Sequence, residues 1–290
     1  MTVFSFILTE RCNWLCEYCA FPYMQNKSDT TIDILRKHLP YIRRIKNKCR
    51  DEILVEIQGG EVGLLDIEVL REFCKLIDSK ICVSTNGKFM ERDYHKDPML
   101  RPYINEILWH VCPNPSTSKV SVDYNDDEIF INKGVVFTNE DYIEDFFKVN
   151  EHITFDFMDL ECSIRNKNYI PSYAFRPIFE RVKDIPNLTH NAKKRMYLRG
   201  SERENARLNC QMFHLSLVVD LVNEKICQCQ RCPENNIDLT EENVIKRLTN
   251  FLHGLFPGYK RGCESCIRLY FDKYGVKNLE QVFRNKRIFK

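Results

Sequence analysis

Residues 9–19 read TERCNWLCEYC, and this stretch decides the fold that we expect for the chain. Its three cysteines, Cys12, Cys16 and Cys19, follow the spacing Cys-x3-Cys-x2-Cys, and the loop holds no fourth cysteine. Such a loop can fold back so that three thiolates point at one centre, and thiolates are the usual ligands of iron–sulfur clusters. A 4Fe–4S cluster held by three thiolates keeps an open position on one iron, where a substrate or cofactor can bind. The alternatives are a zinc knuckle or three unrelated buried thiols.

The same stretch resembles the signature of the radical S-adenosylmethionine (radical SAM) superfamily, Cys-x3-Cys-x-aromatic-Cys, with Tyr18 in the aromatic position. The resemblance implies that Cys12, Cys16 and Cys19 hold a 4Fe–4S cluster and that Tyr18 lies at the site of S-adenosylmethionine (SAM). In that family the open iron binds the amino and carboxylate groups of SAM. The reduced cluster cleaves SAM to methionine and a 5′-deoxyadenosyl radical, which takes a hydrogen atom from the substrate. An electron donor such as flavodoxin or ferredoxin is therefore an expected partner.

The composition excludes several other classes of protein. The 290 residues include 43 Lys and Arg against 41 Asp and Glu, so no bulk charge favours nucleic acid or a membrane surface. The apolar run at 3–8 is too short for a signal peptide, and no run of about 20 apolar residues predicts a membrane span. We therefore expect a cytoplasmic protein, in which fourteen cysteines favour metal binding over disulfides.

Apolar strands and amphipathic helices alternate after the cysteine loop. We expect strands at 3–8, 53–57, 81–84, 107–111, 129–137 and 153–158, and helices at 31–46, 66–79 and 139–148. Ser28, Asp29 or Thr30 is expected to cap the first helix, and Pro40 to kink or break it. Such alternation favours a parallel α/β sheet or barrel with its site at the carboxyl ends of the strands. Six strands by residue 160 match the open, partial (β/α)6 barrel of the TIM type in the resembled family.

The chain is expected to divide into three parts. These are a barrel at 1–188, a polar and basic linker at 189–209, and a small cysteine-rich α+β domain at 210–290. In the last part, 215–221 and 225–227 read as a hairpin. The glycine usual in the family's hairpin turn is absent, and Asn223 is expected to take the left-handed conformation in its place. A helix at 240–255 is expected next, with Thr240 or Asp238 as its cap.

Two loops at the ends of the second and third predicted strands carry further candidates for the SAM site. Gly59 and Gly60 let a backbone pass close to a ligand, and Glu61 adds a carboxylate that can accept an ammonium group. In the resembled family a Gly-Gly-Glu in this place binds the amino group of SAM. The family also carries a Thr-Asn-Gly that lines the same site, and here this tripeptide follows Ser84 and includes Asn86. Either loop could also be a simple turn. Many turns contain Gly-Gly-Glu, and Asn-Gly strongly favours turns. Further candidates for contacts to the ribose and adenine are Asn132, Asp156 and Glu161.

Six cysteines gather in the C-terminal part of the chain: Cys210, Cys227, Cys229, Cys232, Cys263 and Cys266. The set resembles the twitch domain, a shorter relative of the SPASM domain, which holds one auxiliary 4Fe–4S cluster. The resemblance implies that the ligands of this cluster are Cys210, Cys227, Cys263 and Cys266. Cys229 or Cys232 could replace one of these ligands or donate a hydrogen atom to a substrate radical. A zinc ribbon is the alternative.

The family resemblance implies a radical SAM enzyme with one auxiliary cluster. Such enzymes mostly act on ribosomally synthesised peptides, oxidise small alcohols or sugars, or modify sulfatase active sites. We expect modification of a peptide, with dehydrogenation of a small sugar or alcohol as the alternative. Because the first strand begins at Val3, we expect no leader-binding domain before it, and hence a separate leader-binding protein or a leader-independent substrate. From another class, a zinc-stabilised binding module without catalysis remains open, although the charge balance disfavours nucleic acid.

Overall fold

The fold is built on one curved sheet. The computed structural model describes residues 2–14, 16, 28–49, 53–111, 122–137, 140–160, 175–193, 216–227 and 236–252. The strands are β1 (Thr2–Ile7), β2 (Ile53–Gln58), β3 (Ile81–Thr85), β4 (Ile104–Val111), β5 (Phe130–Phe137), β6 (Phe157–Leu160), β7 (Ser216–Asp220), β8 (Lys225–Cys227) and β9 (Ile237–Asp238). The α-helices are α1 (Ile32–Lys48), α2 (Ile67–Ile77), α3 (Lys88–Glu91), α4 (Ile143–Val149), α5 (Phe175–Val182) and α8 (Glu241–Leu252).

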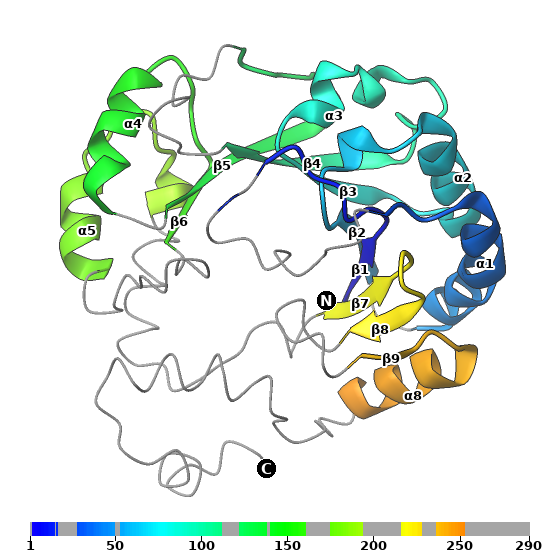
Figure 1. The fold of residues 1–290 in the computed structure, drawn as a ribbon. Helices are drawn as coiled ribbons and strands as arrows, with labels where there is room; N and C mark the ends of the chain where they lie inside the picture. The colour runs from blue at the N-terminus through cyan, green and yellow to red at the C-terminus, as the bar shows by residue number, and fades with distance from the viewer. Residues whose placement is uncertain are drawn as a thin grey trace, which may run out of the picture.

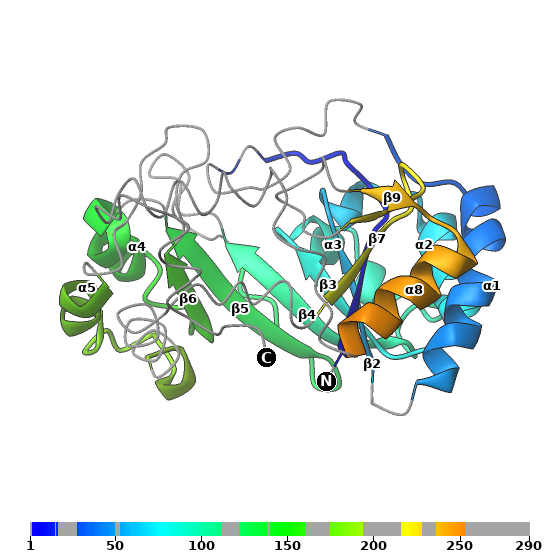
Figure 2. The ribbon, with the colours of Figure 1, turned by 90° about the horizontal axis from the view of Figure 1, so that it is seen from below.

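The order of the strands gives the architecture. Within the described ranges, nine strands pair in the order β6-β5-β4-β3-β2-β1-β7-β8-β9. The pairs from β6 to β7 are parallel, and the last two pairs are antiparallel. Figures 1 and 2 show α1 and α2 outside one end of the curved sheet and α4 and α5 outside the other. Parallel strands joined by crossover helices are the units of a (β/α) barrel, so β1–β6 confirm the predicted partial (β/α)6 barrel.

The core lies between the sheet and these outer helices. Phe4 and Phe6 of β1 are fully buried, and the ring of Phe6 meets that of Phe73 in α2 edge to face at 5.2 Å. Leu35 and Leu39 of α1 are fully buried in the same cluster. Side chains alternate between the faces of a strand, so Ser5, between Phe4 and Phe6, points to the other face of the sheet.

Helix α1 begins and continues differently from the prediction. Thr31 caps it by accepting a 3.3 Å hydrogen bond from the backbone N–H three residues on, so the predicted caps Ser28, Asp29 and Thr30 are wrong. Asp29 instead pairs with side chains of the cysteine loop, and the Thr30 hydroxyl donates to a carbonyl after β7. The predicted break at Pro40 is also wrong. Pro40 is exposed, and buried residues before and after it hold both halves of the helix on the sheet.

The sixth strand begins later than the sequence predicted. β6 starts at Phe157, whereas Ile153 and Phe155 are fully buried but lie before the strand. Phe155 makes only an isolated bridge with Leu188. The side chain of Asn187 donates to the carbonyl of Ile153 at 3.1 Å. These residues are therefore as apolar and buried as a strand, but their backbone groups pair with the segment after α5.

The predicted hairpin is confirmed as β7 and β8, and β7 pairs in parallel with β1. The hairpin therefore continues the sheet of the barrel. Glu224, with φ of 52°, takes the left-handed conformation that we had expected at Asn223. Asn223 instead uses its side-chain amide to donate hydrogen bonds to two carboxylates. The proposed boundary between the barrel and a C-terminal domain remains a prediction.

The last described helix, α8, follows Thr240, whose hydroxyl accepts a 3.2 Å hydrogen bond from the backbone of Asn243. This confirms Thr240 as the cap in preference to Asp238. The predicted end of the helix at residue 255 lies outside the described residues, as do residues 194–209 of the predicted linker.

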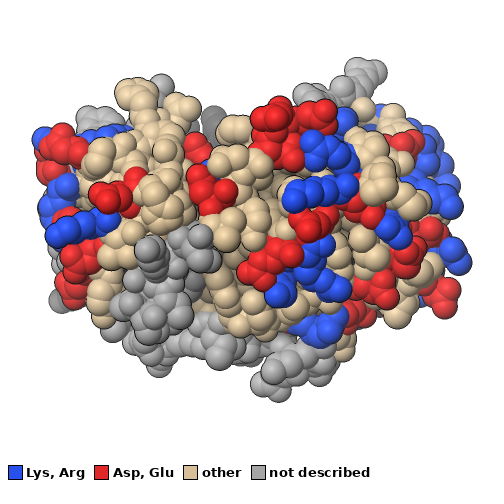
Figure 3. Space-filling view, turned by 90° about the horizontal axis from the view of Figure 1, so that it is seen from above, with Lys and Arg blue, Asp and Glu red and all other residues tan. Residues whose placement is uncertain are grey.

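Charged side chains of both signs are interspersed over the face shown in Figure 3. Several of the chain's charges form ion pairs, such as Arg36 with Glu72 at 2.7 Å and Arg101 with Asp126 at 2.8 Å. Arg36 is 61% exposed, and an exposed pair of this kind contributes about 0–1 kcal/mol, whereas the Asp126 side chain is only 9% exposed and accepts two hydrogen bonds from Arg101. Among the described helices, none combines the length and apolar character needed to cross a membrane.

Candidate functional site

The cysteine loop leaves the carboxyl end of β1 through two anchored residues, Thr9 and Arg11. The Thr9 hydroxyl donates to Asp29 at 2.6 Å, and the guanidinium of Arg11 pairs with the same carboxylate. Arg11 also donates to the carbonyl of Leu64 at 2.7 Å. The hydrogen bond that Arg11 donates to Asp29 is the main reason that the pKa of Arg11 is raised. The path of the chain is therefore fixed immediately before Cys12.

The loop after β2 lies directly against this anchored segment. The backbone N–H of Gly60 donates to the carbonyl of Thr9 at 2.8 Å, and that of Glu61 donates to the carbonyl of Arg11 at 2.7 Å. A Cβ atom on Gly60 would lie 2.1 Å from the Arg11 oxygen, and Gly59 has φ of +131°. Both glycines are therefore needed for the close approach of the two loops, in addition to any role toward a ligand.

Glu61 joins the loop after β2 to the loop after β3. Its Oε1 accepts 2.7 Å hydrogen bonds from the Gly63 backbone and the Thr85 hydroxyl, and its Oε2 accepts one of 2.6 Å from the Asn86 backbone. The residue is only 1% exposed. Burial raises the pKa of Glu61, and the hydrogen bonds from Asn86, Thr85 and Gly63 act against that shift. All these contacts are made to the chain itself, so the expected contact of this carboxylate with the SAM ammonium stays a prediction.

Asn86 completes the connection by reaching the cysteine loop. Its Nδ2 donates to Asn13 Oδ1 at 2.9 Å and lies 3.9 Å from the sulfur of Cys12. Ser84, two residues earlier, points to the neighbouring strand, where its hydroxyl is 3.4 Å from Nε2 of His110. The structure thus brings Cys12, the Gly-Gly-Glu loop and Asn86 together at the carboxyl edge of β1–β3, the edge that the sequence predicted.

The described architecture matches solved structures. No protein-family model and no curated protein matches the chain. Native anSMEcpe with bound AdoMet and the Cp18Cys peptide superposes with a TM-score of 0.58 at 12% identity, covering 98% of this chain and 99% of that one. Histidine-tagged anSMEcpe with bound AdoMet gives a TM-score of 0.56 at 11% identity, with 98% and 96% covered. AnSMEcpe is a radical SAM enzyme. The chain shares the fold of anSMEcpe.

Several predicted site residues stay untested. Tyr18 and Cys19 lie outside the described residues, as does Glu161. The same holds for the C-terminal candidates Cys210, Cys229, Cys232, Cys263 and Cys266, while Cys227 ends β8 and its side chain is not described. In the described part of the chain, no three His, Cys, Asp or Glu side chains form a group that could hold a metal.

Asn132 lies on β5 and Asp156 lies directly before β6. Both strands are at the end of the sheet away from β1. Asn132 donates to Glu106 at 3.2 Å, and Asp156 accepts from the Lys133 backbone at 3.1 Å. Contacts of these two side chains with the ribose or adenine remain predictions.

A row of polar side chains on the inner face of the barrel was not predicted from the sequence. The register places Ser5 opposite Glu56, Glu56 opposite Cys82 and Cys82 opposite Glu106. The Ser5 hydroxyl donates to Glu56 at 2.8 Å. Burial, with Glu106 nearby, raises the pKa of Glu56, and burial with both carboxylates raises that of Cys82. The signal in the sequence was that each of these apolar strands carries a polar residue at one of the alternate positions that share a face.

The link that Thr85 makes to Glu61 was also not predicted, although Thr85 belongs to the Thr-Asn-Gly of the predicted loop. It is 3% exposed, and its hydroxyl accepts a 3.0 Å hydrogen bond from the Gly87 backbone besides donating to Glu61. A threonine that ends a buried strand is a signal for such a link, because its hydroxyl must find a partner when it is buried.

Proposed function

We propose that this chain is a radical SAM enzyme that binds SAM beside a 4Fe–4S cluster and abstracts a hydrogen atom from its substrate. The observation that carries the proposal is the contact of Asn86 with Asn13 and Cys12, at 2.9 and 3.9 Å. This contact supports a single site formed by the loops after β1, β2 and β3. Ligands of parallel α/β barrels bind at this edge.

The residues present fit the cluster that this function requires. Cys12 is an exposed thiol and Cys16 a partly buried one, four residues apart on a loop anchored by Thr9 and Arg11. Thiolates are the usual ligands of iron–sulfur clusters. We assign Cys19 as the third ligand from its spacing. When bound, the reduced cluster and SAM supply the 5′-deoxyadenosyl radical; the protein supplies binding, orientation and the exclusion of competing reactions.

The other residues of the site would orient SAM. Gly59 and Gly60 offer backbone groups beside the cysteine loop, while Ser84 and Asn86 offer a hydroxyl and an amide at the end of β3. Glu61 holds these two loops in register through its hydrogen bonds to the Thr85 hydroxyl and the Asn86 backbone. Tyr18 would lie beside the cluster, as its place in the motif implies.

We propose a ribosomally synthesised peptide as the substrate. Support comes from anSMEcpe, which shares the fold and whose structure contains a bound peptide. A small sugar or alcohol is the outcome to test against it. We further propose an auxiliary 4Fe–4S cluster on Cys210, Cys227, Cys263 and Cys266, an electron donor such as flavodoxin or ferredoxin, and a separate leader-binding protein or a leader-independent substrate.

Metal and SAM analysis of the anaerobically purified, reconstituted protein tests this function. Bound iron and sulfide, broad visible absorbance and saturable binding of SAM are expected. A colourless protein that contains zinc and binds no SAM would contradict the proposal and favour the zinc-stabilised binding module. Assays with peptides and with sugar or alcohol substrates then separate the two substrate classes by the product that each yields.

A further inference from the structure

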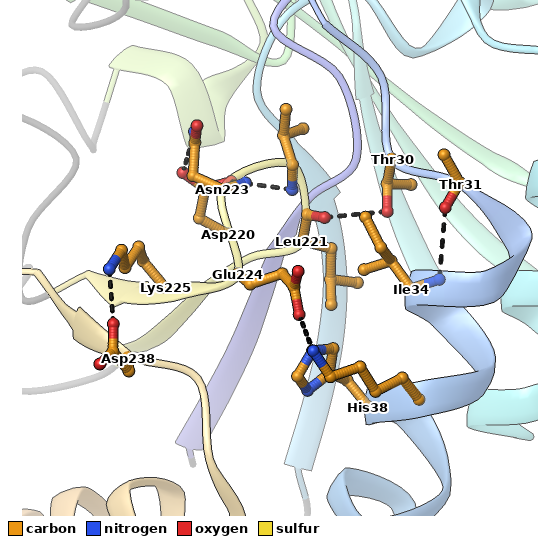
Figure 4. Close-up of polar contacts among 12 residues, drawn as sticks. Thr30, Thr31, Ile34, His38, Asp220, Leu221, Asn223, Glu224, Lys225 and Asp238 are labelled. Atoms are coloured by element: carbon orange, nitrogen blue, oxygen red, sulfur yellow. Dashed lines mark hydrogen bonds and ion pairs between the residues drawn. The ribbon is translucent and has the colours of Figure 1, made fainter.

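The turn between β7 and β8, residues 221–224, is held against two segments of the barrel that flank the cysteine loop (Figure 4). The backbone N–H of Leu221 donates to the carbonyl of Ile7 at 3.0 Å, at the end of β1. The Thr30 hydroxyl, from the segment before α1, donates to the carbonyl of Leu221 at 2.9 Å. The turn is therefore fixed beside the point where the chain enters the cysteine loop.

Asn223 in this turn contacts the cysteine loop directly. Its Nδ2 donates to Glu10 at 2.7 Å and to Asp220 at 2.8 Å. Both carboxylates are buried, since Glu10 is 8% exposed and Asp220 is 4% exposed. Asp220 keeps two other donors, the backbone N–H groups of Val222 and Asn223, each at 3.0 Å.

Glu10 depends much more on Asn223. In the part of the chain that the structure describes, its Oε2 has no hydrogen-bond partner, and the 2.7 Å bond from Asn223 to Oε1 is the contact that satisfies the group. A buried carboxylate that loses its donor pays a desolvation cost and moves toward water or another donor. The conformation of Glu10 is therefore sensitive to residue 223.

A movement of Glu10 would be transmitted through the backbone to the Gly-Gly-Glu loop. Glu10 lies between Thr9 and Arg11, whose carbonyls accept the hydrogen bonds from Gly60 and Glu61. The hydrogen bonds at the two ends of this sequence of contacts are 2.7–2.8 Å long, and peptide bonds join Glu10 to its two neighbours. The β7–β8 turn is thus connected with the loop after β2 across two adjacent residues of the cysteine loop.

We propose that Asn223 is a positioning residue for the SAM site: it fixes Glu10, and through the backbone of Thr9 and Arg11 it sets the Gly-Gly-Glu loop. The proposal rests on the proposed function, because SAM is the ligand of that loop. It gives the β7–β8 hairpin, which ends at Cys227, an influence on the proposed SAM site beside the cysteine loop.

The test combines the substitutions Asn223→Ala and Glu10→Gln in the reconstituted full chain. Two quantities are measured: the Kd for SAM, and amide hydrogen exchange at residues 9–11 and 59–61 without SAM. For Asn223→Ala we expect faster exchange at both segments and a Kd raised about fivefold or more, as is typical of coupled sites. Glu10→Gln added to Asn223→Ala should restore both, because an unpaired neutral amide costs less to bury than an unpaired carboxylate. A purely structural defect of the turn would not be rescued in this way.

The matched control is Glu224→Gln in the same turn. Glu224 pairs with Lys37 and with Nε2 of His38 on α1 and makes no described contact with the cysteine loop. This variant should lose stability but keep the wild-type Kd for SAM.

Two outcomes would overturn the proposal: wild-type exchange and Kd in Asn223→Ala, or no rescue by Glu10→Gln. If Asn223→Ala is insoluble, Asn223→Ser replaces it, since serine favours turns but lacks the amide donor. If the wild-type chain binds no SAM, the proposed function fails, while the exchange data still test the link between Asn223 and the two loops.

Discussion

The Glu61 carboxylate accepts a 2.7 Å hydrogen bond from the Thr85 hydroxyl, and both residues are buried. The bond joins the carboxyl ends of β2 and β3. With the backbone bonds from Glu61 to Arg11 and from Gly60 to Thr9, it makes one network of the three loops that carry the candidate SAM residues.

Replacing Thr85 by Val should loosen this network. The substitution keeps the shape of the side chain but removes a donor to a buried carboxylate, at a cost of about 1–3 kcal/mol. Urea denaturation should show this loss, and SAM should bind more weakly because Asn86 follows directly. Thr85→Ser keeps the hydroxyl and serves as the control. Equal stability of Thr85→Val and wild type would show that the bond is not formed.

Glu61→Ala should weaken SAM binding about ten- to a hundredfold, the range of one charge-assisted hydrogen bond. The iron content should stay unchanged, because the described contacts of this carboxylate are with the loops after β2 and β3. Calorimetric titration with SAM and iron analysis of the same sample check both statements. An unchanged affinity would mean that the Gly-Gly-Glu is only a turn.

The stability of the chain should depend on pH through Glu56. Burial raises the pKa of this carboxyl group above its usual value of 4.5, so the native state holds its proton at pH values where the unfolded chain has lost it. Its contribution is therefore most favourable at low pH and is lost as the pH rises through the raised pKa. Glu56→Gln removes the titration, so the stability of the variant relative to wild type should increase with pH in urea denaturation. A difference that is constant with pH would contradict the raised pKa.

The contacts described above also show what the sequence could predict. β1, β2 and β3 and the positions of Cys12, Glu61 and Asn86 followed from local patterns: apolar runs that end in short loops with polar residues. The bond between Asn223 and Glu10 spans 213 positions, and no local pattern signals it. The cap at Thr31 was missed for a related reason, because Asp29 and Thr30 are occupied by tertiary partners.

Mutating Cys263 and Cys266 together should remove the auxiliary iron and lower solubility. The proposed ligands come from distant segments, and metal binding to such thiolates is itself folding free energy. SAM cleavage should survive in the soluble fraction, whereas product formation should not. Iron analysis and product assays check this. Retention of iron and product after removal of all six C-terminal cysteines would exclude an auxiliary cluster.

Single variants assign Cys229 and Cys232 in the same experiment. If Cys229→Ala loses auxiliary iron and Cys227→Ala does not, Cys229 is the ligand. If either Cys229→Ala or Cys232→Ala keeps full iron but stops turnover after hydrogen abstraction, that residue is the hydrogen donor.

The most direct test is the formation of 5′-deoxyadenosine from SAM by the reconstituted chain with dithionite. We expect the wild-type chain to form it. A variant with Cys12, Cys16 and Cys19 all replaced by Ala should lack one 4Fe–4S cluster and form none, while remaining soluble with its auxiliary iron intact. Continued formation of 5′-deoxyadenosine by this triple variant would contradict the assignment of the cysteine loop as the site of the reaction.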